Sequence, residues 1–301
     1  MLSSRGPFFG GTRYYICMRR VLGKISLYLA LSSAFLCTTV VVVLVSLVDY
    51  FSPPAFFTSL ANVQNVSAES FVIFDIESGE VLFEKNADEK IPVASIAKLI
   101  AAVVVFHEDY IWNTATVTWS DLEAEGRAGK LSYGESYMIY TLLFPLLLES
   151  SNDAARVFER NDQELINKMN TYTETLSIQN TKFADASGLS QENAGTAREL
   201  SVLLRKIRQE EKHIIDITSL PMYLSSDNGW VNNNPFVNDQ NYIGGKHGYT
   251  HESLYTAALI FNEPLNNGVN REVGYIVLGS HDLQSDIPLL QNAVQTQLVN
   301  L

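Results

Sequence analysis

The stretch from Ser95 to Val105 constrains the fold more than any other part of this 301-residue chain. It predicts a helix that is apolar on nearly every side, with Leu99, Ile100, Ala101, Val103, Val104 and Val105. Such a helix has no face suited to water, so we expect it in the middle of a domain. Lys98, its only charged residue, would then be buried.

Lys98 also belongs to the only Ser-x-x-Lys tetrad of the chain, Ser95-Ile96-Ala97-Lys98. A serine and a lysine three residues apart on a helix project from the same face. An uncharged lysine there can take the proton of the serine hydroxyl and make it a nucleophile. A chain of this composition contains roughly one such tetrad by chance, so the tetrad alone does not define a site.

The N-terminal part predicts a membrane anchor. The first 24 residues hold five basic residues and no acidic one: Arg5, Arg13, Arg19, Arg20 and Lys24. Residues 25–48 (Ile25–Val48) are uncharged and long enough to cross a bilayer as a single transmembrane helix. The basic arm, residues 1–24, should stay cytoplasmic and place the rest outside the cell membrane. A cleaved signal peptide is the alternative, but the apolar run is long for one and no small-x-small cleavage site follows.

Residues 49–68 read as a linker, because Pro53-Pro54 blocks a continuing helix. Residues 69–301 form the predicted exported domain. The net charge of the whole chain is −12, and the basic arm makes the exported part more acidic still. Such a surface argues against nucleic acid as a partner. Both cysteines, Cys17 and Cys37, precede the exported part, which therefore has no disulfide and needs an ordinary core.

Strand patterns occur at both ends of the exported part. Ser70–Asp75 and Glu80–Phe83 predict a hairpin around Glu77-Ser78-Gly79, and Leu254–Phe261 and Val273–Gly279 predict two further strands. Between them, Thr196-Ala197-Arg198-Glu199 reads as a capping box that opens a helix. A last helix is expected from about Pro288 to Leu298. Strands from distant segments with helices between them imply one sheet covered by helices, an α/β (α+β) fold.

Two further motifs follow the tetrad. Ser150-Ser151-Asn152 comes 55 residues after Ser95, and Lys246-His247-Gly248-Tyr249 comes 96 residues after Ser150. In this order the motifs resemble those of the D-alanyl-D-alanine carboxypeptidase family, the low-molecular-weight penicillin-binding proteins. The resemblance extends from about Glu69 to Val299. Supporting matches are Phe71–Asp75 with Gly79–Leu82, Gly134-Glu135, and Phe183-x-Asp185-x-x-Gly188-Leu189.

The resemblance implies a β-lactamase/transpeptidase-like fold, with an antiparallel sheet covered by helices and a mostly helical subdomain. It implies a serine-type D-Ala-D-Ala carboxypeptidase that acts on peptidoglycan stem peptides and is acylated by β-lactams. Ser95 would be the nucleophile, Lys98 the general base and Ser150 the proton donor to the leaving amine.

The remaining motif residues are expected to bind substrate. Asn152 would hold Lys98 and a substrate carbonyl, and Lys246 would attract a substrate carboxylate. The strand Lys246, His247, Gly248 and Tyr249 would line the substrate, and the backbone N–H groups of Ser95 and Tyr249 would stabilise the oxyanion. Burial and the nearby Lys246 should lower the pKa of Lys98.

His247 departs from the family pattern, which has Thr or Ser at this position. Its imidazole could donate a hydrogen bond, or carry a charge below about pH 6.5. The family also tends to have an arginine near the last helix, and Gln284-Ser285-Asp286 has none. Whether the protein prefers substrates with a free C-terminal carboxylate is therefore open. A DD-endopeptidase of the same fold and a non-catalytic peptidoglycan or β-lactam-binding protein remain alternatives. A β-lactamase would need a deacylating glutamate in a Glu-x-x-Leu-Asn motif, and this chain has no such motif.

Two other patterns are interpreted as incidental. His247 and His251 would lie ~13 Å apart on a strand, too far to share a zinc ion, so we expect no metal and no cofactor. Ser226-Asp227-Asn228 spells a second Ser-x-Asn, but it lies only 20 residues before Lys246. We expect it in an exposed loop from Ser225 to Asn234.

Overall fold

The computed structural model describes residues 63–126, 129–225, 228–264 and 270–298. The predicted cytoplasmic arm, the transmembrane helix at residues 25–48 and most of the linker lie outside these residues. Within the described part, no helix combines the length and hydrophobicity that a membrane crossing requires.

A five-stranded antiparallel sheet runs through the domain in the order β2-β1-β11-β10-β9. Its strands are β1 (Ser70–Asp75), β2 (Val81–Lys85), β9 (Tyr242–Thr250), β10 (Leu254–Pro264) and β11 (Asn270–Ser280). The chain therefore brings its first and last strands side by side, as predicted from the strand patterns at both ends. β9, which carries the third motif, is an edge strand, so one side of its backbone faces away from the sheet.

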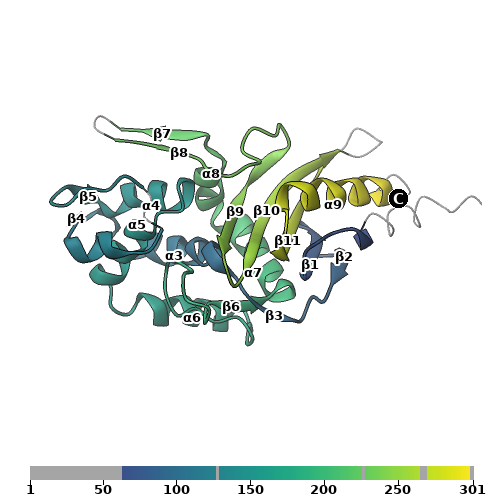
Figure 1. Cartoon of the computed structure of the whole chain (residues 1–301), viewed down its shortest axis with the longest axis horizontal. Helices are drawn as coiled ribbons and strands as arrows, with labels where there is room; N and C mark the ends of the chain where they lie inside the picture. Colours follow the sequence, from purple (N-terminus) through teal and green to yellow (C-terminus); the bar gives the residue numbers. More distant parts are fainter. Residues whose placement is uncertain (1–62, 127–128, 226–227, 265–269, 299–301) are drawn as a thin grey trace, which may run out of the picture. The chain divides into compact units, whose positions relative to one another are not determined.

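Helices and short strands complete the domain (Figure 1). The α-helices are α3 (Ala97–Phe106), α4 (Ile139–Leu148), α5 (Asn152–Asn161), α6 (Leu165–Thr175), α7 (Ala197–Glu210), α8 (Lys212–Ser219) and α9 (Leu283–Leu298). The 3-10 helices are η1 (Ala94–Ile96), η2 (Asp109–Trp112) and η3 (Trp119–Glu123). Three two-stranded ribbons pair β3 (Lys90–Pro92) with β6 (Ala194–Thr196), β4 (Thr114–Thr116) with β5 (Ser136–Met138), and β7 (Met222–Leu224) with β8 (Gly229–Val231).

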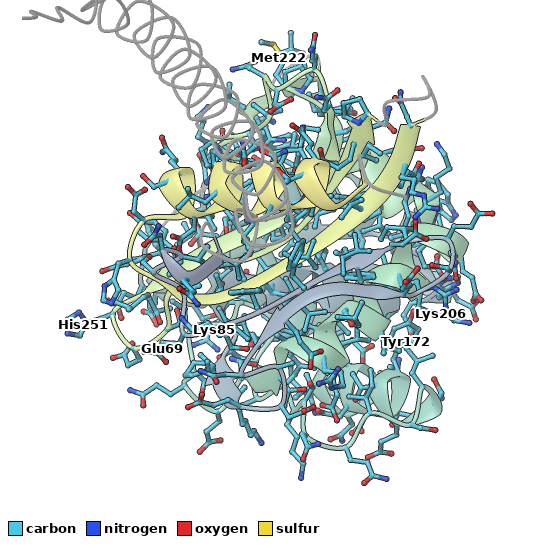
Figure 2. The ribbon with its side chains drawn as sticks, turned by 90° about the vertical axis from the view of Figure 1, so that its right-hand side faces the viewer. Glu69, Lys85, Tyr172, Lys206, Met222 and His251 are labelled. Atoms are coloured by element: carbon cyan, nitrogen blue, oxygen red, sulfur yellow. The ribbon has the colours of Figure 1, made fainter. Side chains whose placement is uncertain are left out.

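The sheet is buried on both faces because helices cover each of them. Alternate residues of β1 show this: Phe71 and Ile73 pack in the cluster that contains α9, whereas Val72 and Phe74 pack in the cluster that contains α3, α4 and α7. Figure 2 shows α9 lying over one face of the sheet, with the helical layer on the other side. Side chains alternate between faces along a strand, so a strand buried on both sides is apolar throughout.

α3 is the centre of the larger cluster. All residues from Ala97 to Val105 are buried, including Lys98, as the apolar pattern predicted. α3 is surrounded by α4, α5, α6 and α8, which supply the mostly helical part of the domain. The expected α+β fold is therefore observed for the described residues.

Two local predictions were wrong, and a third, the capping box at Thr196, was confirmed only in part. α9 begins at Leu283, because Asp282 accepts hydrogen bonds from the N–H groups of Gln284 and Ser285 and so caps the helix, leaving Pro288 in its interior. Only half of the capping box at α7 forms, because Glu199 bonds the loop at residues 179–181 instead of the Thr196 backbone.

The other wrong prediction concerns the stretch from Ser225 to Asn234, which is not a simple exposed loop. Gly229–Val231 forms β8, and Trp230 within it is 1% exposed. Ser226 and Asp227 lie outside the described residues. The polar composition of this stretch suggested an exposed loop. One large aromatic side chain, Trp230, packs against Tyr137 and Tyr223 and holds the stretch on the domain.

Candidate active site

Ser95 is held at the point where strand β3 turns into α3. It lies in η1, one residue after Ala94, whose φ of 48° is in the left-handed region. Thr256 of β10 donates a hydrogen bond to the carbonyl of Val93 (2.9 Å) and ties this turn to the sheet. Gly248 of β9 passes so close that a Cβ there would lie 2.6 Å from the Ser95 nitrogen. The position therefore requires glycine.

Lys98 is one turn further into α3 and is fully buried. Its Nζ donates to Ser95 Oγ (3.1 Å), Asn152 Oδ1 (2.7 Å) and the Ser187 carbonyl (2.5 Å). Burial lowers the pKa of Lys98 well below its usual value, and the cation of Lys246 lowers it further, whereas Asp185 and Glu159 oppose this. The direction agrees with the prediction, and it favours a lysine that can accept a proton.

Ser150 occupies the turn between α4 and α5, with a left-handed φ of 60°. Its Oγ donates to Ser95 Oγ over 3.0 Å. Ser151, the next residue, caps α5 by accepting a hydrogen bond from the N–H of Ala154. The second motif thus projects Ser150 toward Ser95, while Ser151 holds the turn and Asn152 starts the helix.

Asn152 links the tetrad to a neighbouring loop. Its Oδ1 accepts from Lys98, as predicted, but its Nδ2 donates to the carbonyls of Glu125 (2.6 Å) and Gly126 (3.3 Å). Both amide hydrogens are therefore directed to the loop. A substrate carbonyl would have to replace one of these bonds.

Lys246 and His247 are consecutive residues of β9; Lys246 is buried, whereas His247 is partly exposed. Burial lowers the pKa of Lys246 to about 7, and its Nζ donates to the His247 carbonyl (2.7 Å). Among the described residues, no carboxylate lies within ion-pair distance of Lys246. Burial, and then the Lys246 cation, lower the pKa of His247 to about 3. This lowered pKa opposes the expectation that His247 gains a charge below about pH 6.5.

An open cleft of about 700 Å³ exposes this group of residues. Its walls include Ser95, Ser150, Asn152, His247, Gly248 and Tyr249. Tyr249 is 55% exposed at the rim, where its ring lies 4.7 Å from that of Tyr255. His251, in the turn after β9, projects outward (Figure 2). The structure thus gathers every predicted site residue at one cleft, with Lys98 and Lys246 buried behind it.

The loop at residues 185–193 contributes to the site in a way that was not predicted from the sequence. Asp185 accepts hydrogen bonds from the N–H groups of Ser187, Gly188 and Ser190, and from the side chain of Asn193. These bonds present the Ser187 carbonyl to Lys98. Asp185 and Gly188 belong to one of the supporting sequence matches. That match alone did not indicate that this loop holds the Ser187 carbonyl against Lys98.

The fold and this site define a class. A crystal structure of a penicillin-binding protein homologue from Mycobacterium tuberculosis superposes with a TM-score of 0.68, at 26% identity over 76% of this chain and 92% of that one. A D-alanyl-D-alanine carboxypeptidase of the same organism gives a TM-score of 0.67, at 26% identity over 77% and 90% of the two chains. The domain therefore has the penicillin-binding, transpeptidase-like fold.

The family follows from the sequence comparison. Residues 57–266 match the model of the D-alanyl-D-alanine carboxypeptidase family, and the chain belongs to that family. It is 29% identical to a D-alanyl-D-alanine endopeptidase of Pseudomonas aeruginosa over 63% of this chain and 59% of that protein. It is 32% identical to a D-alanyl-D-alanine carboxypeptidase of Mycobacterium tuberculosis over 63% and 68%. The chain thus spans about three fifths of the length of the first of these relatives.

Proposed function

We propose that this protein is a serine-type DD-peptidase that cleaves D-alanyl amide bonds of peptidoglycan stem peptides through an acyl-enzyme on Ser95. One observation carries the proposal. Ser95 Oγ faces an open cleft while it lies within hydrogen-bonding distance of both Lys98 Nζ (3.1 Å) and Ser150 Oγ (3.0 Å). A nucleophile, a buried base and a second hydroxyl for proton transfer are the parts that acyl transfer requires.

In the acylation step, Lys98 Nζ takes the proton of Ser95 as Oγ attacks the carbonyl carbon of the penultimate D-alanine. The oxyanion would be stabilised by the backbone N–H groups of Ser95 and Tyr249, a role that belongs to the family. The C–N bond then breaks, and the proton passes from Lys98 through Ser150 to the leaving amine. A water molecule next attacks the ester carbonyl while Lys98 Nζ takes one of its protons, and Lys98 then gives that proton to Ser95 Oγ as the ester C–O bond breaks.

The same attack would open the ring of a β-lactam and leave a covalent adduct on Ser95. β-lactams are therefore the proposed covalent inhibitors, and peptidoglycan stem peptides the proposed substrates. The shared geometry supports both proposals, because one nucleophile and one oxyanion site serve the two carbonyls. No cofactor has a role in this chemistry.

The leaving group decides between two reactions. Release of a terminal D-alanine makes the protein a carboxypeptidase, the activity that the family description names. Cleavage of a cross-link makes it an endopeptidase, the second candidate. His247 favours the second, because it replaces a hydroxyl that would hold a terminal carboxylate and its pKa of about 3 leaves it uncharged at neutral pH.

We also propose that residues 25–48 anchor the protein in the cell membrane with the catalytic domain outside, on the strength of their uncharged composition and basic flank. The protein should then retain its N-terminus and leave the membrane fraction only with detergent. A mature N-terminus beyond Val48 in the soluble fraction would refute the anchor.

The test of function combines labelling and turnover. The protein is incubated with a fluorescent penicillin, and separately with a pentapeptide and with cross-linked muropeptides. Labelling with product from either substrate supports the DD-peptidase, and the faster substrate identifies the reaction. Labelling without turnover of either would instead identify a non-catalytic binding protein.

A further inference from the structure

A second cleft of about 450 Å³ opens beside the catalytic cleft, on the side of His247. Asn233 and His247 contribute to both, so they form the wall between the two. The other lining residues come from the loop between β8 and β9, from the start of β10 and from the segment that leads into and begins α9: Pro235, Tyr255, His281, Asp282, Leu283 and Gln284. The catalytic chemistry proposed above uses none of these six residues.

The second cleft borders the turn that carries Ser150, because Asn233 lines the cleft and contacts that turn. Ser150 would protonate the departing amine, and it directly follows Glu149, whose carbonyl accepts a hydrogen bond from Asn233 Nδ2 (3.0 Å). The backbone N–H of Asn233 also bonds the Leu148 carbonyl (3.0 Å). Asn233 therefore stands next to the Ser150 turn, so a leaving group that extends from Ser150 toward the second cleft would pass Asn233 and His247.

The chemistry of the second cleft does not suit a carboxylate. No lysine or arginine is among its lining residues, and Asp282 places a carboxylate there. The α9 N–H groups that could attract an anion are already occupied, because Gln284 and Ser285 donate to Asp282 Oδ1 (3.1 and 3.2 Å). The Ser285 hydroxyl, which donates to Asp282 Oδ2, and then these N–H groups lower the pKa of Asp282, so the carboxylate is charged at neutral pH.

The second cleft does offer partners for an uncharged or amine-bearing chain. His247 Nδ1 is buried and has no hydrogen-bond partner among the described residues. A neutral imidazole at a cleft wall can exchange a hydrogen bond with a peptide group. Tyr255, 38% exposed, adds a hydroxyl and an aromatic surface, and Gln284 is exposed beside it.

We propose that the second cleft binds the part of the substrate that continues beyond the residue released by Ser95, and that it selects chains whose continuation is a neutral amide or carries an amine. The inference rests on the proposed DD-peptidase function and names its substrate class: peptides in which the leaving residue is itself linked onward, as in a cross-link. A free terminal D-alanine would leave most of the second cleft unfilled, and its carboxylate would face a wall that includes Asp282 and no lysine or arginine.

Three peptides test this proposal. All carry the same acyl part, which ends at the penultimate D-alanine, and the D-alanine that follows ends in a free carboxylate, in a simple amide, or in an amide-linked glycinamide. We expect kcat/KM to rise from the acid to the amide and again to the extended peptide, by about tenfold overall. The amide separates the effect of charge from that of length. An acid cleaved as fast as the extended peptide would overturn the proposal.

Two variants of Gln284 add a direct readout. Gln284→Arg puts a cation in the second cleft and should raise the ratio of acid to extended peptide about tenfold. Gln284→Trp fills the space without charge and should lower kcat/KM for the extended peptide relative to the simple amide. Gln179→Arg is the matched control, because Gln179 is exposed and lines neither cleft. Equal ratios in all four proteins would contradict the assignment.

Acylation of Ser95 by a penicillin, measured on the same samples, separates this inference from the proposed function. Normal acylation with no preference among the three peptides overturns the second-cleft proposal and leaves the DD-peptidase intact. Absence of both acylation and turnover overturns the DD-peptidase itself, and the second-cleft proposal with it.

Discussion

Gly188 lies directly against the carbonyl of Ala94, so that a Cβ at Gly188 would come within 1.9 Å of the Ala94 oxygen. Both residues have positive φ, 81° and 48°. This contact joins the loop that supplies the Ser187 carbonyl to the turn that carries Ser95. The nucleophile and one partner of its base are therefore positioned by a single close approach of two backbones.

Gly188→Ala should accordingly damage both stability and the site. The backbone clash cannot be relieved by a side-chain movement, so we expect a loss of about 3 kcal/mol in the free energy of unfolding. Acylation of Ser95 should slow in parallel. Gly134→Ala is the control: its φ of 82° is similar, but nothing lies within 4 Å of the added Cβ. It should cost only about 1 kcal/mol. Urea unfolding that gives equal losses for the two variants would refute the contact's role.

The pKa of Lys98 should set the acid limb of the acylation rate. Lys98 must be neutral to accept the Ser95 proton, so the rate falls as pH falls through its pKa. Lys246 helps to keep that pKa low. Lys246→Met removes the cation and should therefore move the acid limb to higher pH. The exposed Lys182→Met makes the same charge change elsewhere and should leave the limb in place. A limb that does not move in Lys246→Met would show that Lys98 does not sense Lys246.

His247 should contribute no charge to catalysis above pH 5. Its pKa of about 3 predicts that wild-type activity on a free D-Ala-D-Ala terminus does not rise as pH falls through 6.5. His247→Thr restores a hydroxyl and should raise kcat/KM for the free terminus about tenfold. The two pH profiles should have the same shape, because Lys98 sets both. A wild-type gain near pH 6.5 that disappears in His247→Thr would mean that the imidazole is protonated in the working enzyme.

Glu263 is a buried carboxyl on the α9 side of the sheet, 1% exposed. Burial raises its pKa, although Tyr275, Gln295 and Gln291 donate hydrogen bonds that oppose the shift. A raised folded-state pKa means that the folded protein binds more protons than the unfolded chain. Its stability contribution is therefore full below the unfolded value and is lost as pH rises through the folded pKa.

Glu263→Gln keeps an uncharged group of the same shape and should remove this pH dependence. We expect the variant to gain stability relative to wild type as pH is raised from about 5 to about 8, measured by urea unfolding. Because Glu263 lies on the α9 side of the sheet, penicillin acylation serves as an independent check that the site is intact. A constant difference in unfolding free energy at all pH values would show that Glu263 stays ionised in the folded protein.

Local patterns predicted much of the fold. β1 runs from Ser70 to Asp75 as expected, and the apolar stretch after Ser95 is the buried central helix. These features depend on residues close in sequence. The start of α9 was missed because Pro288 suggested a first turn, whereas Asp282 supplies the cap. The Glu199 side chain was predicted to bond the backbone of Thr196, three residues away, but the loop at residues 179–181 donates hydrogen bonds to that carboxylate instead.

The site was predictable where the chemistry resides in side chains of recognisable motifs, and not where it depends on backbone or on empty space. Ser95, Lys98 and Ser150 were placed together from their motifs. The Ser187 carbonyl at Lys98 and the loop carbonyls at Asn152 carry no side-chain signature, so only the tertiary arrangement reveals them. The second cleft beyond His247 is formed by three separate segments and was likewise invisible in the sequence.

The covalent step on Ser95 is the central claim, and peptide mass spectrometry after incubation with a penicillin tests it most directly. One penicilloyl group should be found on the peptide that contains Ser95. Ser95→Ala should abolish both the adduct and turnover, Lys98→Ala should slow acylation at least about 100-fold, and Ser226→Ala should be labelled like wild type. An adduct on Ser226, or labelling that survives in Ser95→Ala, would contradict the account.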